Sequence, residues 1–146
     1  MKTGDSKIDE RKLIGCIARR EDWGNCHGFW ATTYEFQPGF FEMDFLPNLL
    51  NLGSWDDHHW TTRITLEREL ALMDTASIML DAGCYNERPQ SLRVEILPTK
   101  GRNGNKLHAK VLLCLYENAL HLIVGSANLT DPGYRKNIEV AAVLTV

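Results

Sequence analysis

The sequence has few residues of the kinds that would place it at once in a specialised class of protein. Its four cysteines lie far apart, without a Cys-x-x-Cys pair. We therefore expect reduced thiols, and neither a disulfide framework nor a zinc ribbon. No apolar run approaches the roughly 18–20 residues of a membrane span, and the polar start MKTGDSKIDERK lacks the apolar core of a secretory signal. These absences predict a cytoplasmic protein without a membrane partner.

A strong excess of charge is also missing. The formal net charge of -3 gives no sign of a nucleic-acid binder by charge alone. The charge is unevenly placed, however, because Lys100, Arg102, Lys106 and Lys110 follow one another closely while acidic residues dominate positions 35–81. A locally positive site on an acidic body would suit a phosphate-bearing ligand, and a solvated loop is an equally good interpretation.

The hydrophobic pattern predicts one domain with an α/β fold, in which a mixed β-sheet is flanked by helices. A chain of 146 residues buries about 68–70% of its unfolded surface without disulfide staples. Residues 1–25 are poorly patterned and predict a mobile N-terminal lead, and residues 26–146 form the domain. We expect a kink or break at Pro47. The expected helices are 40–53 and 60–73, and the expected strands are 29–36, 76–83, 91–98, 107–117, 119–126 and 138–146.

His108 and Lys110 are the first candidates for chemistry. Residues two apart in a strand point to the same face, so the two side chains are expected to project together. A single histidine in an apolar strand is usually structural, but burying an ammonium beside it is costly unless an anion lies between them. Ser126 and Asn128 offer short neutral donors to phosphate oxygens, and Gly125 permits close backbone approach.

These residues carry a resemblance to a known family. His108-Ala-Lys110 followed by Gly125-Ser126-Ala-Asn128 resembles the HxK…GSxN motif of the phospholipase D superfamily, and Asn137-Ile-Glu139 looks like its NxE segment. The resemblance covers most of residues 29–146 and implies an αβα sandwich. Leu115 stands where the fuller family motif has an aspartate. The tyrosyl-DNA phosphodiesterase branch also lacks that aspartate, which favours the nuclease-like branches over lipid-cleaving enzymes.

The resemblance implies a metal-independent phosphodiesterase without a cofactor. His108 would attack phosphorus and form a phosphohistidine, while Lys110, Ser126 and Asn128 would hold the non-bridging oxygens. Glu139 would accept a hydrogen bond from one imidazole nitrogen. The family mechanism needs two HxK motifs and the sequence has one. We expect the second from a homodimer partner or from a C-terminal half that the sequence lacks.

Other residues are weaker candidates. Lys106, Tyr134 and Arg135 are expected to contact substrate, although a solvated turn would also explain Arg135. The stretches Trp55–Trp60 and Cys26-His27 contain metal-ligand types, but their spacing is wrong for one ion, and no metal is expected. The mid-strand His121 is expected to be structural. The aromatic residues Phe29, Trp30, Tyr34 and Phe36 could stack on bases if exposed, but are more typical of a core.

We therefore expect a phosphodiesterase, most simply a nuclease acting on DNA or RNA. The first alternative is a non-catalytic half-domain that binds phosphate or nucleic acid and assembles with a partner. The second is a phospholipid headgroup hydrolase, which the acidic sequence without an anchor does not favour.

Overall fold

The computed structural model describes residues 12–53 and 60–146, which form one six-stranded β-sheet. The strands follow the spatial order β3-β2-β1-β4-β5-β6, so the first strand of the chain lies in the middle of the sheet. The six strands are β1 (Cys26–Thr33), β2 (Thr75–Asp81), β3 (Glu95–Thr99), β4 (Val111–Tyr116), β5 (Leu120–Gly125) and β6 (Ala141–Thr145).

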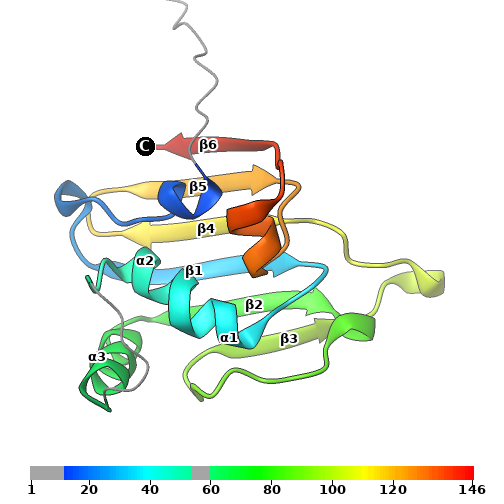
Figure 1. Ribbon diagram of the computed structural model, residues 1–146, viewed down its shortest axis with the longest axis horizontal. Coiled ribbons are helices and arrows are strands. Elements are labelled where there is room, and N and C mark those ends of the chain that lie inside the picture. The colour runs from blue at the N-terminus through cyan, green and yellow to red at the C-terminus, as the bar shows by residue number, and fades with distance from the viewer. Residues whose placement is uncertain (1–11, 54–59) are drawn as a thin grey trace, which may run out of the picture.

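The sheet has a parallel half and an antiparallel half, which meet between β1 and β4 (Figure 1). β1 pairs with β2 and β2 with β3 in parallel, whereas β4, β5 and β6 continue beyond β1 in antiparallel pairs. The C-terminal ends of β1, β2, β3 and β5 therefore share one edge with the N-terminal ends of β4 and β6. We name this the site edge; it is formed by Thr33, Asp81, Thr99, Val111, Gly125 and Ala141.

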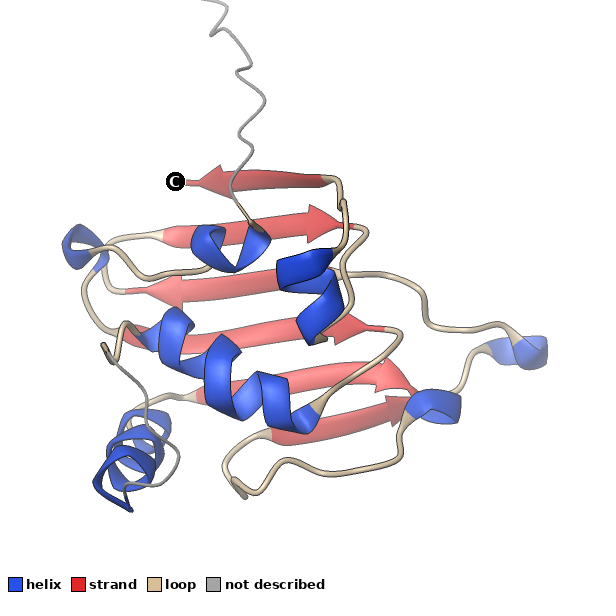
Figure 2. Cartoon of the chain, in the orientation of Figure 1, coloured by secondary structure: helices blue, strands red, loops and turns tan. Residues whose placement is uncertain are grey.

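A layer of short helices covers one face of the sheet (Figure 2). Its centre is a continuous segment in which the π-helical turn η3 joins two short α-helices. Pro47 lies in the first turn of α2, where its missing backbone donor is tolerated, so the predicted break is a change of helix type. The helices are η1 (Leu13–Cys16), η2 (Glu21–Trp23), α1 (Pro38–Phe40), η3 (Phe41–Phe45), α2 (Leu46–Leu50), α3 (Trp60–Ala71), η4 (Ala82–Cys84), η5 (Arg102–Gly104) and η6 (Pro132–Lys136).

Between this layer and the sheet lies an aromatic core. The ring of Phe29 on β1 lies 6.1 Å from that of Phe41, which in turn stacks on Phe45 at 5.5 Å. All three side chains are fully buried. The predicted α/β fold, a mixed sheet flanked by helices, is thus confirmed. Within residues 12–53 and 60–146, no helix combines the length and apolar character needed to cross a bilayer.

The described part of the N-terminal lead packs against this core. Ile17 is fully buried, and the Trp23 ring lies 4.9 Å from the ring of His121 on β5. His121 is itself buried, with Thr145 and the carbonyl of Cys16 as partners of its two ring nitrogens. Residues 12–25 therefore belong to the packed domain, contrary to the mobile lead that we expected, and His121 is structural, as the sequence predicts.

The opposite face of the sheet carries large apolar side chains that remain accessible. Trp30, Met79, Leu115, Val124 and Leu144 are between 37% and 53% exposed. On β1, β2, β4 and β5 these side chains alternate with buried residues, whereas β6, which carries Leu144, has no buried residue. The helices that cover the sheet thus make one layer, on the other face, and the described residues form no second helical layer of the kind implied by an αβα sandwich.

Four strands begin three or four residues from the expected position, among them β4, which begins at Val111, four residues late, and β6, which begins at Ala141, three residues late. β1 begins at Cys26, three residues early, and β3 begins at Glu95, four residues late. Leu92 was expected to alternate with Val94 and Ile96 in β3, but it is 84% exposed before the strand begins. Residues 55–59 of the weighed metal-ligand stretch lie outside the described residues.

Candidate functional site

His108 and Lys110 lie at the site edge, in the extended segment that leads into β4. They precede Val111, the first residue of β4, so the prediction that they lie within the strand is wrong. Their side chains nevertheless project together, as the two-residue spacing predicts. The Nζ atom of Lys110 lies 3.0 Å from Nδ1 and 2.9 Å from the carbonyl oxygen of His108.

Hydrogen bonds from neighbouring strands hold this segment in place. The carboxylate of Asp81, at the end of β2, accepts hydrogen bonds from the backbone N–H groups of Leu107 and Gly83, both at 2.9 Å. On the other side, the N–H group of Gly125 donates to the carbonyl of Lys110 at 3.1 Å. Asp81 is therefore a positioning residue that the sequence analysis missed, because the contact depends on where β2 ends.

The ammonium group of Lys110 is buried beside an exposed histidine. The lysine residue is only 8% exposed, whereas His108 faces solvent. Burial lowers the pKa of Lys110, and the charges of Glu139 and Glu35 act in the opposite sense. No carboxylate in the described part of the chain forms an ion pair with Lys110. The group is a partly desolvated cation whose partners are neutral: two atoms of His108 and the ring of Tyr34, whose centroid lies 6.0 Å from Nζ.

The lysine also determines the form of the histidine ring. An ammonium group can only donate hydrogen bonds, so Nδ1 of His108 is the acceptor in this contact. The proton of the neutral imidazole then lies on Nε2. A nucleophilic Nε2 would require the opposite tautomer, with the proton on Nδ1 and Lys110 directed elsewhere.

Tyr34, for which the sequence pattern favours a core position over base stacking, is a second residue of the site. Its half-buried ring lies 5.2 Å from the ring of His108, and its hydroxyl accepts a hydrogen bond from Nζ of Lys106 at 2.7 Å. Tyr34 therefore contacts both His108 and Lys106. Its position immediately after β1 was the available signal, since ligands of α/β sheets bind at the carboxyl ends of parallel strands.

Ser126 and Glu139 are brought together on the antiparallel side of the site. The Ser126 hydroxyl donates a short hydrogen bond to the Glu139 carboxylate and accepts one from the backbone N–H of Val140 at 3.1 Å. Asn137 donates to the other carboxylate oxygen at 3.3 Å. The expected hydrogen bond between Glu139 and His108 is therefore replaced by bonds within the Ser126, Asn137 and Glu139 group.

Asn128 links the site to the end of β1. Its side-chain oxygen accepts hydrogen bonds from the backbone N–H groups of Tyr34 and Glu35, both at 3.2 Å. Its amide nitrogen has no hydrogen-bond partner among the described residues. Because no buried side-chain nitrogen in that part of the chain lacks a partner, this nitrogen reaches solvent. Asn128 thus keeps one donor for a ligand while its acceptor fixes the site.

Two glycines allow these segments to approach one another. A Cβ atom at Gly125 would lie 2.7 Å from the carbonyl oxygen of Val140, and one at Gly133 would lie 2.5 Å from that of Asn128. The close approach that we expected of Gly125 is therefore an approach to the neighbouring backbone of the chain. Any side chain at either position would push apart the segments that carry Ser126 and Asn128.

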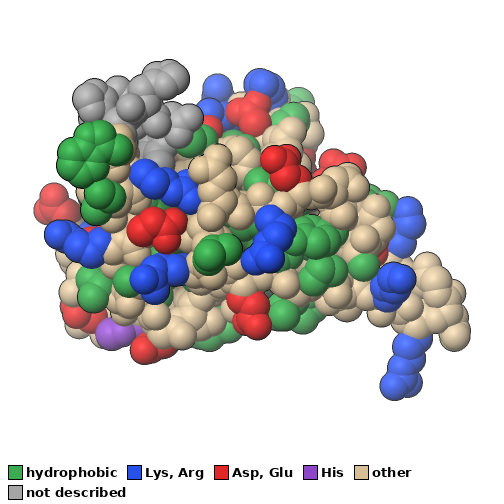
Figure 3. All heavy atoms as spheres, turned by 90° about the horizontal axis from the view of Figure 1, so that it is seen from below, with side chains coloured by type: hydrophobic (Ala, Val, Ile, Leu, Met, Phe, Trp, Pro, Cys, Tyr) green, Lys and Arg blue, Asp and Glu red, His purple; other side chains and the backbone are tan. Residues whose placement is uncertain are grey.

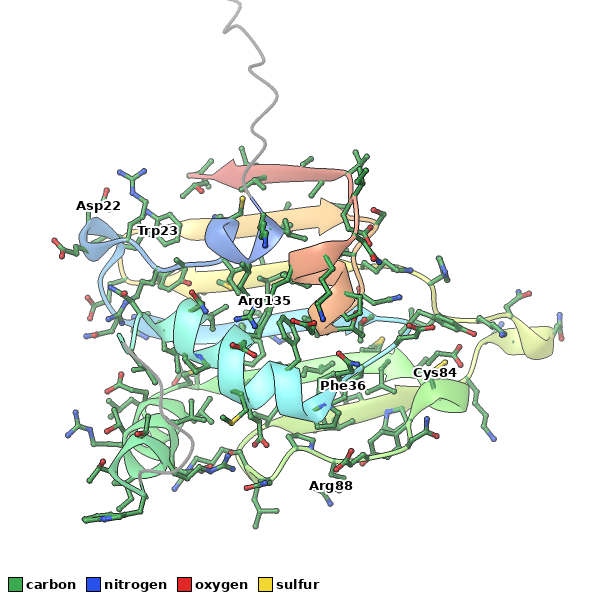
Figure 4. The ribbon with its side chains drawn as sticks, in the orientation of Figure 1. Asp22, Trp23, Phe36, Cys84, Arg88 and Arg135 are labelled. Atoms are coloured by element: carbon green, nitrogen blue, oxygen red, sulfur yellow. The ribbon has the colours of Figure 1, made fainter. Side chains whose placement is uncertain are left out.

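Tyr134 and Arg135 are not placed to contact a substrate, contrary to expectation. Tyr134 is 5% exposed and packs with its ring 5.4 Å from Phe45. Arg135 lies over the helical layer in Figure 4 and forms ion pairs with Asp44 and Asp131. Both residues therefore stabilise the packing of η6 on η3. Of the predicted contact residues, Lys106 lies at the site and is fully accessible.

The described residues bring one histidine to the site edge. His27 is the second residue of β1, at the opposite edge, and His121 is buried. Within the same residues, no three His, Cys, Asp or Glu side chains gather closely enough to hold a metal ion. The fold and the site thus define an α/β domain with one His-Lys pair, one Ser-Glu pair and one asparagine at the end of a mixed sheet.

Comparisons with known proteins give only distant likeness in fold. No protein-family model matches the sequence, and no curated protein matches it. Among solved structures, the chain is similar to NucT from Helicobacter pylori, with 18% sequence identity and a TM-score of 0.45. The match covers 91% of this chain and 74% of that chain.

Proposed function

We propose that this chain is a metal-independent phosphodiesterase that cleaves nucleic acid through a phosphohistidine on His108. The observation that carries the proposal is the buried ammonium of Lys110, which touches His108 and has no carboxylate partner among the described residues. A desolvated cation of this kind is costly unless an anion completes its environment. A phosphoryl group beside His108 would supply that anion next to the nucleophile.

Binding of the phosphate would also prepare the nucleophile. The ammonium of Lys110 exchanges the neutral Nδ1 atom for a charged phosphoryl oxygen, which is the stronger hydrogen-bond acceptor. The ring proton then moves to Nδ1 and leaves the lone pair on Nε2. Glu139, whose charge already raises the pKa of Lys110, is proposed to accept a hydrogen bond from the protonated Nδ1.

The reaction then follows two displacements at phosphorus. Nε2 of His108 attacks, a P–N bond forms and the P–O bond to the leaving group breaks, while a second histidine gives its proton to the departing oxygen. In the second step water attacks, the P–N bond breaks, and the second histidine takes the proton of that water. Lys110, the Asn128 amide nitrogen and the Ser126 hydroxyl hold the non-bridging oxygens as charge develops.

The second histidine is proposed to come from a second copy of the chain. Among the described residues, neither His27 nor His121 can reach His108, because one lies at the opposite edge and the other is buried. In a symmetric dimer each copy presents the same surface. Two exposed His108 side chains could therefore meet across a two-fold axis at the site edge.

The proposal is tested by hydrolysis of bis(p-nitrophenyl) phosphate in the presence of EDTA. We expect turnover by the wild-type protein, no turnover by His108→Ala, and a loss of about 10²–10³-fold for Lys110→Met, because one preorganised donor to the oxyanion is removed. Mass spectrometry of the quenched wild-type reaction should show a phosphoryl adduct on His108.

His27→Ala provides the matched control, since His27 is also a solvent-accessible histidine but lies at the opposite edge of the sheet. Its turnover should equal that of the wild type. Equal turnover by His108→Ala and the wild type would refute the proposed nucleophile.

Binding without turnover is the second candidate function, and the presence of one histidine at the described site favours it. A half-domain of this kind would bind inorganic phosphate through Lys110, Ser126 and Asn128 but would form no adduct. Loss of phosphate binding in Lys110→Met, together with no turnover by any variant, would identify this function.

A further inference from the structure

A basic loop extends from the site edge between β3 and β4. We name it the basic arm and define it as residues 100–106, whose cations are Lys100, Arg102 and Lys106. It reaches beyond the sheet at the right of Figure 1, and Lys and Arg side chains cover the corresponding protrusion in Figure 3. No Asp or Glu occurs from position 96 to position 116. The arm is therefore a positive feature on a chain of net charge -3.

The backbone of the arm adopts a defined turn. Asn103 and Gly104 adopt left-handed backbone conformations, with φ of 58° and 76°. A Cβ atom at Gly101 would lie 2.2 Å from the carbonyl oxygen of Asn105, so the two ends of the turn touch. Left-handed residues are favoured where Asn or Gly is present. The cations are thus presented on a defined turn.

Nothing in the fold uses the two outer cations. Lys100 and Arg102 are exposed, and neither forms an ion pair with a carboxylate of residues 12–53 or 60–146. By contrast, Arg63 and Arg135, which lie in the packed body of the protein, each contact two carboxylates. The outer cations of the arm are therefore available to an external anion.

The inner end of the arm reaches the site itself. Lys106 donates to the hydroxyl of Tyr34, whose ring contacts the ring of His108. Arg102 precedes His108 by six positions, which sets an upper limit of roughly 20 Å on the distance between their Cα atoms. Consecutive nucleotides in a strand of duplex DNA rise about 3.4 Å each. A strand of about six nucleotides is therefore long enough to contact both ends at once.

From this juxtaposition we propose that the basic arm binds the phosphate backbone of a polynucleotide on one side of the phosphate held at His108. The inference rests on the proposed function and narrows its substrate to a polymer. An anionic membrane would be the other multivalent partner. Interfacial binding normally inserts apolar side chains, and residues 100–106 contain none. Their asparagines and glycines suit hydrogen bonding to a nucleic acid.

The test compares the double variant Lys100→Gln/Arg102→Gln with the wild type, both carrying His108→Ala for the binding measurements. Fluorescence anisotropy in EDTA with a 20-nucleotide DNA, single-stranded and duplex, measures affinity as a function of salt. Loss of two phosphate contacts should lower the slope of log K against log[salt] by about 1.4 for the single strand and about 1.8 for the duplex. For the activity measurements both proteins keep His108. The double variant should then cleave the oligonucleotide more slowly than the wild type and hydrolyse bis(p-nitrophenyl) phosphate at the same rate.

Arg20→Gln/Arg68→Gln is the matched control, because it removes the same charge from two exposed arginines far from the site edge. Its salt slope should equal that of the wild type. Equal slopes for the arm variant and the wild type, or an equal decrease in the control, would overturn the inference. So would unchanged DNA affinity with weakened binding of the arm variant to phosphatidylserine vesicles. A lower salt slope in the arm variant, together with no hydrolysis of bis(p-nitrophenyl) phosphate by the wild type, would support binding of nucleic acid by the basic arm and refute the proposed catalysis.

Discussion

At the residue scale, burial fixes the side chain of Lys110 beside His108. Its stem lies beneath the site edge, and its ammonium reaches atoms of one histidine. Lysine is seldom buried without a partner charge. The hydrogen bond from Lys110 to Nδ1 of His108 keeps the proton of the neutral ring on Nε2, and in this tautomer Nε2 cannot attack. A ligand anion would therefore act on both groups at once.

His121 is the residue whose protonation should affect stability. Burial lowers the pKa of His121 in the folded protein, so the unfolded chain binds the proton more tightly. Stability therefore increases as the pH rises through the folded pKa toward the unfolded value of about 6.5, and is lost as the pH falls below that value. We expect the urea midpoint of the wild type to be lower at pH 5.5 than at pH 7.5.

The variant His121→Gln isolates this contribution. It should be less stable than the wild type at pH 7.5, because packing against Trp23 is lost, and its midpoint should change less between the two pH values. A midpoint that shifts equally in both proteins would show that other groups govern the pH dependence.

At the element scale, a buried carboxylate joins the helical layer to the loop between β2 and β3. Glu42, on η3, accepts hydrogen bonds from the backbone N–H groups of Gln90 and Ser91 at 3.0 and 2.8 Å, and pairs with Arg63 of α3 at 3.0 Å. Three segments thus converge on one side chain that is 5% exposed. Removal of either charge of the Glu42–Arg63 pair would leave the other without its partner, which is strongly destabilising for a buried pair.

Replacement of this carboxylate should destabilise the fold without touching the site. In Glu42→Gln, one acceptor oxygen becomes an NH₂ group that faces a backbone N–H, and Arg63 loses a charge partner. We expect a loss of about 2–4 kcal/mol in the free energy of unfolding, measured by urea denaturation.

Glu87→Gln makes the same chemical change at an exposed position of the same loop. It should change the free energy of unfolding by no more than about 0.5 kcal/mol. A Glu42→Gln protein as stable as Glu87→Gln would contradict the role given to the carboxylate.

At the scale of the whole molecule, the proposed shared site has a consequence for mixtures. If each site takes one His108 from each of two copies, a dimer of wild-type and His108→Ala chains lacks half of its machinery. Exchange with a ninefold excess of His108→Ala should then lower the activity per wild-type chain by about tenfold.

The measurement is the hydrolysis of bis(p-nitrophenyl) phosphate after the two proteins have been mixed and equilibrated, with light scattering to report the mass. Bovine serum albumin at the same concentration controls for dilution. Activity proportional to the wild-type chain, whatever the excess, would show that one copy suffices.

Much of the sheet could be predicted from the sequence because β1, β2, β4 and β5 carry buried residues on one face. Phe29 and Ala31 on β1, or Leu112 and Cys114 on β4, alternate with more exposed neighbours, and this period of two is visible in the residues themselves. Expected strands correspond to all six observed ones, although β1, β3, β4 and β6 each begin three or four residues from the expected position. The ends depend on partner strands, which local pattern does not specify.

The site was predicted to the extent that it is local. His108 and Lys110 are two apart, and Ser126 and Asn128 are two apart, so a short motif carries each pair. The roles of Tyr34 and Asp81 at the site were not predicted, because these residues stand at the ends of other strands. The order of the sheet brings Tyr34 to His108 and Asp81 to the backbone of Leu107. Tyr134 was misjudged for the converse reason. A turn after a motif is normally exposed, but η6 folds back onto Phe40 and Phe45.

The amino-acid sequence by itself determined the alternation that makes a two-faced sheet, the His-Lys and Ser-Asn pairs, and the acid-free stretch that contains the basic arm. These are properties of neighbouring residues and follow from side-chain period and composition. The tertiary structure decided which of them meet. Parallel and antiparallel pairing around β1 brings segments from four strands to one edge, and burial there turns Lys110 from a surface charge into a cation that is short of an anion.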